Sequence, residues 1–442
     1  MREALGAVII LAAALCWQPA DTFPTSPLLP LASRWPLHPP LRHRPPDGAH
    51  TAMASASADA DSWVQSAVLS NRLGVLMLNR PKALNAADQH VTSLLLSTLH
   101  EWERDEAVRA VLVRSTSERA FCSGGDVKAI ATDLRADPSS QTPYTALSNE
   151  YRLLCRLQRW AAADGLDVPS IAIMDGVTMG FGVGLGSGAR YRVVTERTLL
   201  AMPENAIGLF PDIGFAYLMR DQPCVGLYLA LTGTRIGAKA SPSADIISLG
   251  LGTHYVPSES LPALVHALEA ADLGGSNADS AIQAILADFA QECPDACSFD
   301  ALKPMLARCF NPEDKTCVRD IISSLEKEAA KEAAGEPSVL ERAARAALDA
   351  LATGAPMSLE LTLAHFRDIS IKLQQGKAVL LPEVLTSGNF PPACALQLRT
   401  SSDLIPVLQA PAPFHAIPHK DDSIQKVAPK DVASWAILRA KR

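Results

Sequence analysis

The chain has 442 residues, of which 48% are hydrophobic and 20% are charged, so it has the composition and length of a soluble globular protein of two or three domains. A net charge of −7 without a Lys/Arg stripe excludes nucleic acid as an expected partner. The 9 cysteines include no CxxC pair and no zinc-ligand spacing, which predicts reduced thiols and no metal site.

Residues 1–60 predict a targeting leader rather than folded protein. The stretch "ALGAVIILAAALCW" is too short for a comfortable membrane span and is similar to the core of a signal peptide. The following "PTSPLLPLASRWPLHPPLRHRPP" is rich in proline and poor in acids, which fits the second part of a bipartite leader. We therefore expect a mitochondrial protein whose mature form has no membrane contact. A plastid or secretory route is the alternative, and an uncleaved membrane anchor is another.

From residue 61 to 257, strand and helix patterns alternate, which predicts an α/β core. The clearest helix is 86–104, where Val91, Leu95 and Leu99 fall on one face at helical spacing. The other predicted elements are strands at 73–79, 109–115, 169–176, 190–196 and 199–204, a small-residue turn at 120–126 that leads into a helix, a helix at 148–162 and a short glycine-rich helix at 180–188.

From residue 258 to about 374 the patterns are helical, and we expect a helical C-terminal region over 258–400. The stretch "SLEKEAAKEAAGEPSVLERAARAALDAL" predicts two helices that are broken at Gly335 and Pro337, with charges on solvated faces. Residues 401–442 are weakly patterned and form a divergent tail.

The glycine run "GFGVGLGSGA" at 180–189 contains the GxGxxA pattern of a dinucleotide site, with Glu204 where a ribose-binding acid would stand. A dinucleotide-binding crossover needs roughly ten or more residues before the next strand. Here a strand pattern begins directly after Gly188, so the spacing argues against a dinucleotide cofactor. A GxSxG nucleophile elbow also fails, because Leu185 replaces its first glycine.

Glycine turns can instead supply backbone amide donors. A short helix that starts near Gly180 leaves its first N–H groups without helical acceptors, and the turn at 124–125 enters a second helix in the same way. Two such amides aimed at one oxygen form an oxyanion hole. Downstream, Glu204 and Asp212 stand in the otherwise apolar run "AMPENAIGLFPDIG". A poorly solvated carboxylate can act as a base or nucleophile near neutral pH.

Four motifs resemble the enoyl-CoA hydratase/isomerase (crotonase) superfamily, in order over about residues 64–255: "LNRPKALNA", "AFCSGGDVKAI", "GVTMGFGVGLG" and "AMPENAIGLFPDIG". Three more, "NEY", "LALTGTRI" and "PMSLELT", are similar to the branch that hydrolyses 3-hydroxyisobutyryl-CoA in valine breakdown. The resemblance implies a ββα spiral core, an acyl-CoA substrate and no cofactor beyond the coenzyme A of that substrate. The helical C-terminal part builds trimers in the superfamily, so a homo-oligomer is an open expectation.

The resemblance also implies individual roles. The residues that it assigns to catalysis are Glu204, Asp212, Gly125 and Phe181. Glu204 would activate water against the thioester carbonyl or attack it directly, and Asp212 would orient the water or hold the substrate hydroxyl. The amides of Gly125 and Phe181 would hold the carbonyl oxygen. The residues that it assigns to substrate binding are Glu150, Lys82, Ala83, Leu84, Gly124 and Asp126. Residues 82–84 would lie along the coenzyme A nucleotide, and Glu150 would contact the hydroxyl of the acyl group.

Each carboxylate has a purely structural alternative. Glu204 and Asp212 follow prolines and could be turn acids, and Glu150 could be an exposed helix position. Two departures from the family also matter. Phe181 replaces a glycine of the oxyanion turn, and after "EVLT" the chain loses the family's usual C-terminal segment. The alternatives to a thioesterase are therefore an enoyl-CoA hydratase or isomerase and a non-catalytic subunit that binds coenzyme A.

Overall fold

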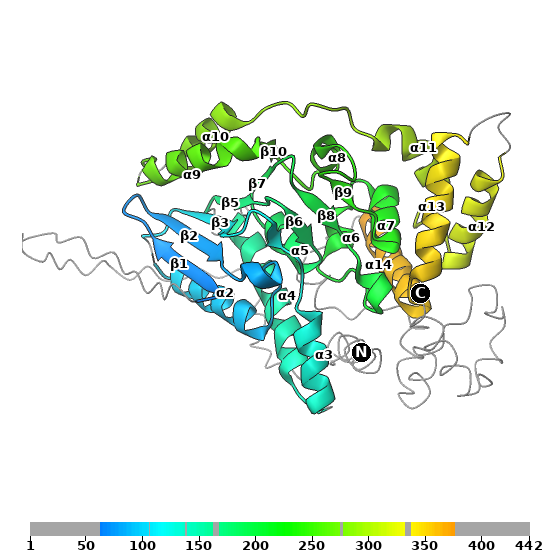
Figure 1. The fold of residues 1–442 in the computed structure, drawn as a ribbon, viewed down its shortest axis with the longest axis horizontal. Helices are drawn as coiled ribbons and strands as arrows, with labels where there is room; N and C mark the ends of the chain where they lie inside the picture. Colours follow the sequence, from blue (N-terminus) through cyan, green and yellow to red (C-terminus); the bar gives the residue numbers. More distant parts are fainter. Residues whose placement is uncertain are drawn as a thin grey trace, which may run out of the picture.

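The computed structural model describes residues 62–375 except 106, 138, 162–167, 275–276 and 332–336 (Figure 1). The predicted leader at 1–60, the tail at 401–442 and the end of the helical region therefore lie outside the described residues. The departure that follows "EVLT" lies outside them as well.

Two sheets form the centre of the protein. The 6-stranded sheet has the order β1-β2-β3-β5-β7-β10, and the 4-stranded sheet has the order β4-β6-β8-β9. Only β1–β2 and β8–β9 pair in the antiparallel sense among the described strands. The strands are β1 Val64–Val68, β2 Leu73–Leu78, β3 Ala110–Ser115, β4 Ala120–Cys122, β5 Ser170–Ile173, β6 Val177–Met179, β7 Tyr191–Val194, β8 Leu199–Ala201, β9 Ile236–Gly237 and β10 His254–Tyr255.

The chain winds between the two sheets as a spiral. A strand of the larger sheet is followed after a short corner by a strand of the smaller sheet, as β3 is by β4, β5 by β6 and β7 by β8, and helical segments then lead to the next winding. This is the predicted ββα arrangement, and the α/β fold class is confirmed. The strands β4 and β6 were not predicted as separate elements. Strand β4 lies in the stretch 120–126, whose small residues predicted a turn, and β6 directly follows the strand predicted at 169–176.

The predicted helices are present with shifted ends. The helix expected at 148–162 begins earlier, at Thr142, and the helix expected from 258 onward is a series of six with one short turn before it. The helices are α2 Gln89–Trp102, α3 Val127–Ala136, α4 Thr142–Ala161, α5 Phe181–Ser187, α6 Phe215–Leu218, α7 Pro223–Thr232, α8 Ser243–Ser248, α9 Leu261–Ala270, α10 Ala278–Phe289, α11 Phe299–Cys309, α12 Val318–Ala329, α13 Val339–Thr353 and α14 Pro356–Gln374, with 3-10 turns η2 Pro81–Ala83, η3 Glu204–Ile207 and η4 Ser258–Ser260.

Both faces of the larger sheet are buried. Successive residues of its central strands point to opposite sides, so each strand contributes to two apolar clusters. Along β3, Ala110 and Leu112 join one apolar cluster, whereas Val111 and Val113 join the other. Helices α9 and α10 cover the first face, as Figure 1 shows above the sheet, and α2 and α4 contribute to the cluster on the second.

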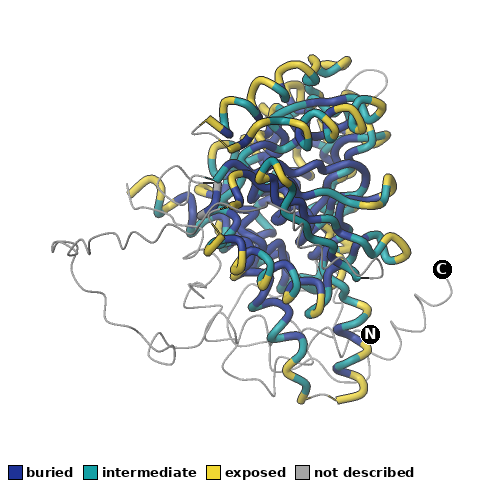
Figure 2. The backbone as a smooth tube through the Cα atoms, turned by 90° about the vertical axis from the view of Figure 1, so that its left-hand side faces the viewer, coloured by how far each residue is buried: buried dark blue, intermediate teal, exposed yellow. Residues whose placement is uncertain are grey.

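The remaining C-terminal helices fold back onto the core. Helices α11, α13 and α14 contact α7, and the Tyr228 ring of α7 lies edge-on to Phe310 with ring centroids 5.2 Å apart. Figure 2 shows the buried segments gathered in the interior and the exposed segments on the outer turns. Helices α11 to α14 and the α/β core therefore share one apolar cluster.

Candidate active site

The ends of three neighbouring strands bring the predicted site residues together. Strand β4 pairs with β6, and β6 pairs with β8, all in parallel. Because the carboxyl ends of parallel strands lie at one edge of a sheet, the turns that follow them meet there. The turn at 123–126 follows β4, Gly180 follows β6 and Glu204 follows β8. A hydrogen bond of 3.2 Å from the Gly180 N–H to the Ala201 carbonyl oxygen joins the last two strand ends.

The two glycine turns touch each other, and their close approach requires glycine. Gly124 has a φ of 108°, and a Cβ there would lie 3.1 Å from the carbonyl oxygen of Met179. Gly180 has a φ of 50°, and a Cβ there would lie 2.6 Å from Oε1 of Glu204. Residues with side chains rarely adopt these φ values. The Glu204 carboxylate therefore faces the start of α5 without an intervening side chain.

The predicted oxyanion amides lie on these turns. The Ala87 N–H donates to the carbonyl oxygen of Gly124 at 2.9 Å, and the Asp126 N–H donates to the carbonyl oxygen of Ala87 at 2.7 Å. Backbone groups of successive extended residues alternate in direction, so the Gly125 N–H points away from Ala87. Phe181 is the first residue of α5, so no carbonyl one helical turn earlier accepts from its N–H. Phe181 is 3% exposed and its ring packs in the main core, so the ring and the N–H need not compete for one place; a role of that N–H in the oxyanion hole stays a prediction.

Three buried carboxylates surround this edge. Glu204, Asp212 and Glu150 are 7%, 8% and 5% exposed, so the alternative of an exposed helix position for Glu150 is wrong. The Tyr151 hydroxyl, next to Glu150 on α4, donates to Oδ2 of Asp212. Oε1 of Glu150 would lie 3.4 Å from a Cβ at Gly125. Oε2 of Glu204 has no hydrogen-bond partner among the described residues. The site thus gathers acids that lack a basic partner within it.

Burial raises the pKa of all three acids, and repulsion by neighbouring carboxylates adds to the shift of Glu204 and Glu150. Burial, with a further contribution from the charge of Asp212, raises the pKa of Glu204 to about 8. Burial raises the pKa of Asp212 to about 6, against the lowering effect of the hydrogen bond from Tyr151. Burial and then the charges of Asp212 and Glu204 raise the pKa of Glu150 well above its usual range. Asp212 is therefore the acid that ionises most readily, and Glu150 holds its proton as the pH rises.

The predicted nucleotide-binding turn, residues 82–84, lies beside the turn at 123–126. The Ser123 N–H donates to the carbonyl oxygen of Leu84 at 3.0 Å. The buried Asn85 fixes this turn, because its Nδ2 donates to the carbonyl oxygens of Ala120 and Phe121 at 3.2 and 3.0 Å. Lys82 is exposed at the tip of η2, where its charge is available to a phosphate. The structure thus brings the predicted coenzyme A turn and the amides to one place.

Asp126 has a structural role that the sequence analysis did not assign. Its carboxylate accepts from the Ala129 N–H at 2.9 Å as the N-cap of α3 and from Nη1 of Arg80 at 2.7 Å. A part in substrate binding stays a prediction. Tyr151 is the residue of the site that sequence reasoning missed, although it stands in the motif "NEY" that pointed to Glu150.

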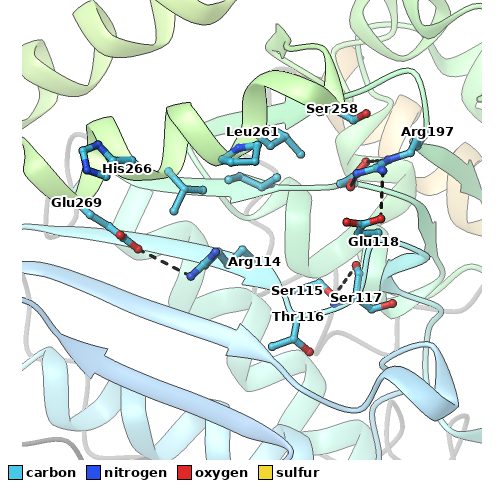
Figure 3. A pocket seen from close by; sticks show the side chains of 14 residues that line it. Arg114, Ser115, Thr116, Ser117, Glu118, Arg197, Ser258, Leu261, His266 and Glu269 are labelled. Atoms are coloured by element: carbon cyan, nitrogen blue, oxygen red, sulfur yellow. Dashed lines mark hydrogen bonds and ion pairs between the residues drawn. The ribbon is translucent and has the colours of Figure 1, made fainter.

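A cavity of about 410 Å³ lies elsewhere, between the ends of β3 and β5 and helix α9 (Figure 3). None of the predicted site residues lines it. Its charged groups compensate one another: Arg114 lies 3.8 Å from Glu269, and Arg197 pairs with Glu118 at 3.6 Å and with Asp175. The cavity is therefore not the candidate active site.

The described part of the chain shows neither a metal centre nor a membrane span. Among these residues there is no group of 3 or more His, Cys, Asp or Glu side chains that could hold a metal ion. No helix within the same residues has the length and apolar character to cross a membrane.

The raised pKa of Glu204 predicts a pH-dependent effect on stability. The folded protein holds the Glu204 proton more tightly than the unfolded chain does, so folding loses stability as the pH rises from about 4.5 to about 8. We expect Glu204→Gln to leave the melting temperature nearly unchanged at pH 5 and to raise it at pH 8. At pH 8 the free energy of unfolding should increase by an amount on the order of a few kcal/mol. Thermal melts at both pH values test this, with the exposed Glu101→Gln as the matched control. An equal change at both pH values would contradict the buried, raised carboxylate.

Comparison with known proteins places this fold and site. Residues 73–389 match the family described as "Enoyl-CoA hydratase/isomerase". The chain therefore belongs to the enoyl-CoA hydratase/isomerase family. In three dimensions it is similar to a carnitinyl-CoA dehydratase from Mycobacterium thermoresistibile, with a TM-score of 0.63 and 29% sequence identity over 85% of this chain and 96% of that one.

The similar curated proteins include 3-hydroxyisobutyryl-CoA hydrolases and a protein of the small ribosomal subunit. A 3-hydroxyisobutyryl-CoA hydrolase 1 of Arabidopsis thaliana is 35% identical over 66% of this chain and 71% of its own length. A mitochondrial 3-hydroxyisobutyryl-CoA hydrolase of Xenopus tropicalis is 34% identical over 71% and 73%. The small ribosomal subunit protein mS47 of Neurospora crassa is 33% identical over 66% and 56%. Relatives of this chain thus include enzymes and a ribosomal protein.

Proposed function

We propose that this protein hydrolyses acyl-CoA thioesters and that its substrate is 3-hydroxyisobutyryl-CoA. The observation that carries the proposal is the buried Glu204 carboxylate, which has Oε2 without a partner among the described residues and Oε1 against the glycine turn at the start of α5. A base or nucleophile needs such poor solvation to work near neutral pH, and the neighbouring amides suit the oxygen of a thioester. The names of the relatives support the choice of substrate.

In the proposed reaction, ionised Glu204 takes a proton from water while the water oxygen bonds to the thioester carbonyl carbon. The carbonyl oxygen becomes negative and accepts from the amides of Gly125 and Phe181. The carbon–sulfur bond then breaks, and the coenzyme A thiolate takes the proton from Glu204. In the alternative route Glu204 bonds to the carbon itself, coenzyme A leaves, and water opens the resulting anhydride.

The other two acids suit the hydroxyl of the acyl group. The hydrogen bond from Tyr151 favours the ionised form of Asp212, which can then accept from that hydroxyl or orient the water. Glu150 retains its proton and can donate to the same hydroxyl. Thiol release from 3-hydroxyisobutyryl-CoA tests the proposal, with isobutyryl-CoA, which lacks the hydroxyl, as the control substrate. No release from either would overturn the proposed activity, and equal rates would overturn only the choice of substrate.

A hydratase activity is disfavoured by the residue at position 184. Hydratases of the superfamily resemble this chain at Glu204 but carry a second glutamate where Gly184 stands. A Cβ at Gly184 would lie 3.0 Å from Leu154 and 3.1 Å from Ile213, so a side chain there would require both neighbours to shift. We therefore expect negligible hydration of crotonyl-CoA, which loss of its absorbance would reveal. Hydration as fast as thioester hydrolysis would contradict the assignment as a hydrolase.

A non-catalytic role is the second candidate, and the likeness to a ribosomal protein favours it. Phe181, which replaces a glycine of the family, also favours the non-catalytic role. The buried carboxylates beside the glycine turns support the catalytic role instead, because the proposed reaction requires both. Coenzyme A binding without any thioester hydrolysis would support the non-catalytic role.

We further propose a mitochondrial location, because a relative of this chain carries that location in its name. The leader that would direct import lies outside the described residues. A fluorescent fusion of residues 1–60 distinguishes the mitochondrion from the plastid or secretory alternatives. The oligomeric state stays a prediction that sedimentation would decide.

A further inference from the structure

The residue after Glu204 joins three segments that are far apart in the sequence. Asn205 is 3% exposed. Its Nδ2 donates to the carbonyl oxygen of Ala230 in α7 at 2.7 Å. Its Oδ1 accepts from the hydroxyl of Thr362 in α14 at 3.1 Å. Its carbonyl oxygen accepts from the N–H of Ala355, just before α14, at 2.9 Å. Both ends of the side chain and the backbone of one residue are thus bound to α7 and to the C-terminal helices.

These contacts explain two motifs that the proposed reaction leaves unused. "LALTGTRI" at 229–236 contains Ala230, and "PMSLELT" at 356–362 ends at Thr362. Neither segment carries one of the predicted site residues, yet both hold Asn205. The segment 229–236 also packs against the backbone that leads to Glu204, because a Cβ at Gly233 would lie 3.4 Å from the carbonyl oxygen of Met202.

The turn that carries Glu204 needs such support. Element η3 has only 4 residues and no side-chain cap, so it has few hydrogen bonds of its own. The charge of Asp212 repels ionised Glu204, which favours displacement of its carboxylate. A buried amide with its hydrogen bonds satisfied opposes this displacement, because breaking them would leave polar atoms buried without partners.

We propose that Asn205 and Thr362 are positioning residues, which hold the Glu204 carboxylate against the glycine turns through the contact between η3 and α14. This inference rests on the proposed catalytic role of Glu204. The Thr362 hydroxyl is also 2.8 Å from the carbonyl oxygen of Ser358, but its single proton can satisfy only one of the two acceptors at a time. The bond to Asn205 is the longer of the two, at 3.1 Å, and it is the one that joins η3 to α14.

The test is Thr362→Val, which keeps the shape of a buried side chain and removes the donor. We expect kcat for thioester hydrolysis to fall about tenfold with KM within about twofold, since a small misplacement of the base affects the chemical step. Thr362→Ser restores the hydroxyl and should recover most of kcat. Thr92→Val is the matched control: Thr92 is buried in α2, and its hydroxyl reaches only carbonyls of its own helix, at Asp88 and Gln89. It should leave kcat unchanged.

Amide hydrogen exchange provides a second readout that does not depend on the substrate. In Thr362→Val the segment 204–209 should exchange about fivefold faster than in the wild type, whereas Thr92→Val should leave that segment unchanged. Unaltered exchange there, or full kcat in Thr362→Val, would overturn the inference. A wild type that releases no thiol would contradict the proposed function instead, and the exchange measurement would still decide whether Thr362 holds the turn.

Discussion

Glu204→Gln should reduce thioester hydrolysis by roughly 10²-fold or more, because the amide keeps the shape of the side chain but can act neither as base nor as nucleophile. The Glu204 carboxylate faces the glycine turn and has one oxygen without a partner among the described residues, so that oxygen is available to the water or the thioester. Steady-state thiol release from 3-hydroxyisobutyryl-CoA measures the effect. Asp212→Asn should cost less if Asp212 only orients the water or the substrate.

The pH profile of the wild type strengthens this test. Glu204 must be ionised to act, and its pKa is raised to about 8, so kcat should increase with pH up to about that value. The three acids interact, and the apparent pKa values therefore belong to the group. If Glu204→Gln has near-normal turnover and differs only in stability, Glu204 is a structural turn acid and the proposed mechanism is wrong.

Gly125→Val should reduce the rate by roughly 10²–10³-fold, or about 3 to 4 kcal/mol, because one oxyanion donor is lost. A Cβ at Gly125 would lie 3.4 Å from Oε1 of Glu150, which is an ordinary contact. Alanine therefore fits, whereas the additional methyl groups of valine would occupy the space where the thioester approaches the amide. Gly125→Ala is the control that separates a blocked approach from a misfolded turn, and it should keep turnover within several-fold.

The comparison with Phe181 separates the backbone from the side chain. Its ring is 3% exposed in the main core, so Phe181→Gly should lose stability, by about 3 to 5 kcal/mol as for other large-to-small core changes, and keep the amide. The folded fraction should turn over within a few-fold of the wild type. Near-equal rate losses in Phe181→Gly and Gly125→Val would mean that these amides do not form the oxyanion hole.

Elements with a long periodic pattern could be predicted from the sequence. The helix at 89–102 and the helical stretch that ends at 374 lie close to their predicted limits, because many residues repeat the same apolar spacing. The strands β4 and β6 were missed because 3 residues carry no period of their own, whereas β8, of equal length, lies inside a longer apolar run that predicted a strand at 199–204. These short strands set the position of both glycine turns, so the geometry of the site depends on elements that the pattern does not reveal.

Most of the candidate site was found through motifs, and what escaped prediction is the way its residues are held. Glu204 and Asp212 stood out as acids in an apolar run, whereas the burial of Glu150 follows only from how α4 packs. The hydrogen bond from Tyr151 crosses 61 residues of chain, and that from Thr362 to Asn205 crosses 157. Hydrophobic periodicity reports which face of an element is buried but not which polar groups meet across such distances.

The bond between Asn205 and Thr362 also bears on the order of events during biosynthesis. A ribosome that adds about 5–20 residues per second needs roughly 8–30 seconds to pass from one to the other. During that interval strands that come early in the chain, such as β1, β2 and β3, can already pair, while the catalytic turn lacks its anchor on α14. The nascent chain should therefore acquire its shape before its activity, and messages that terminate ahead of Thr362 would yield protein that folds in part and cannot turn over substrate.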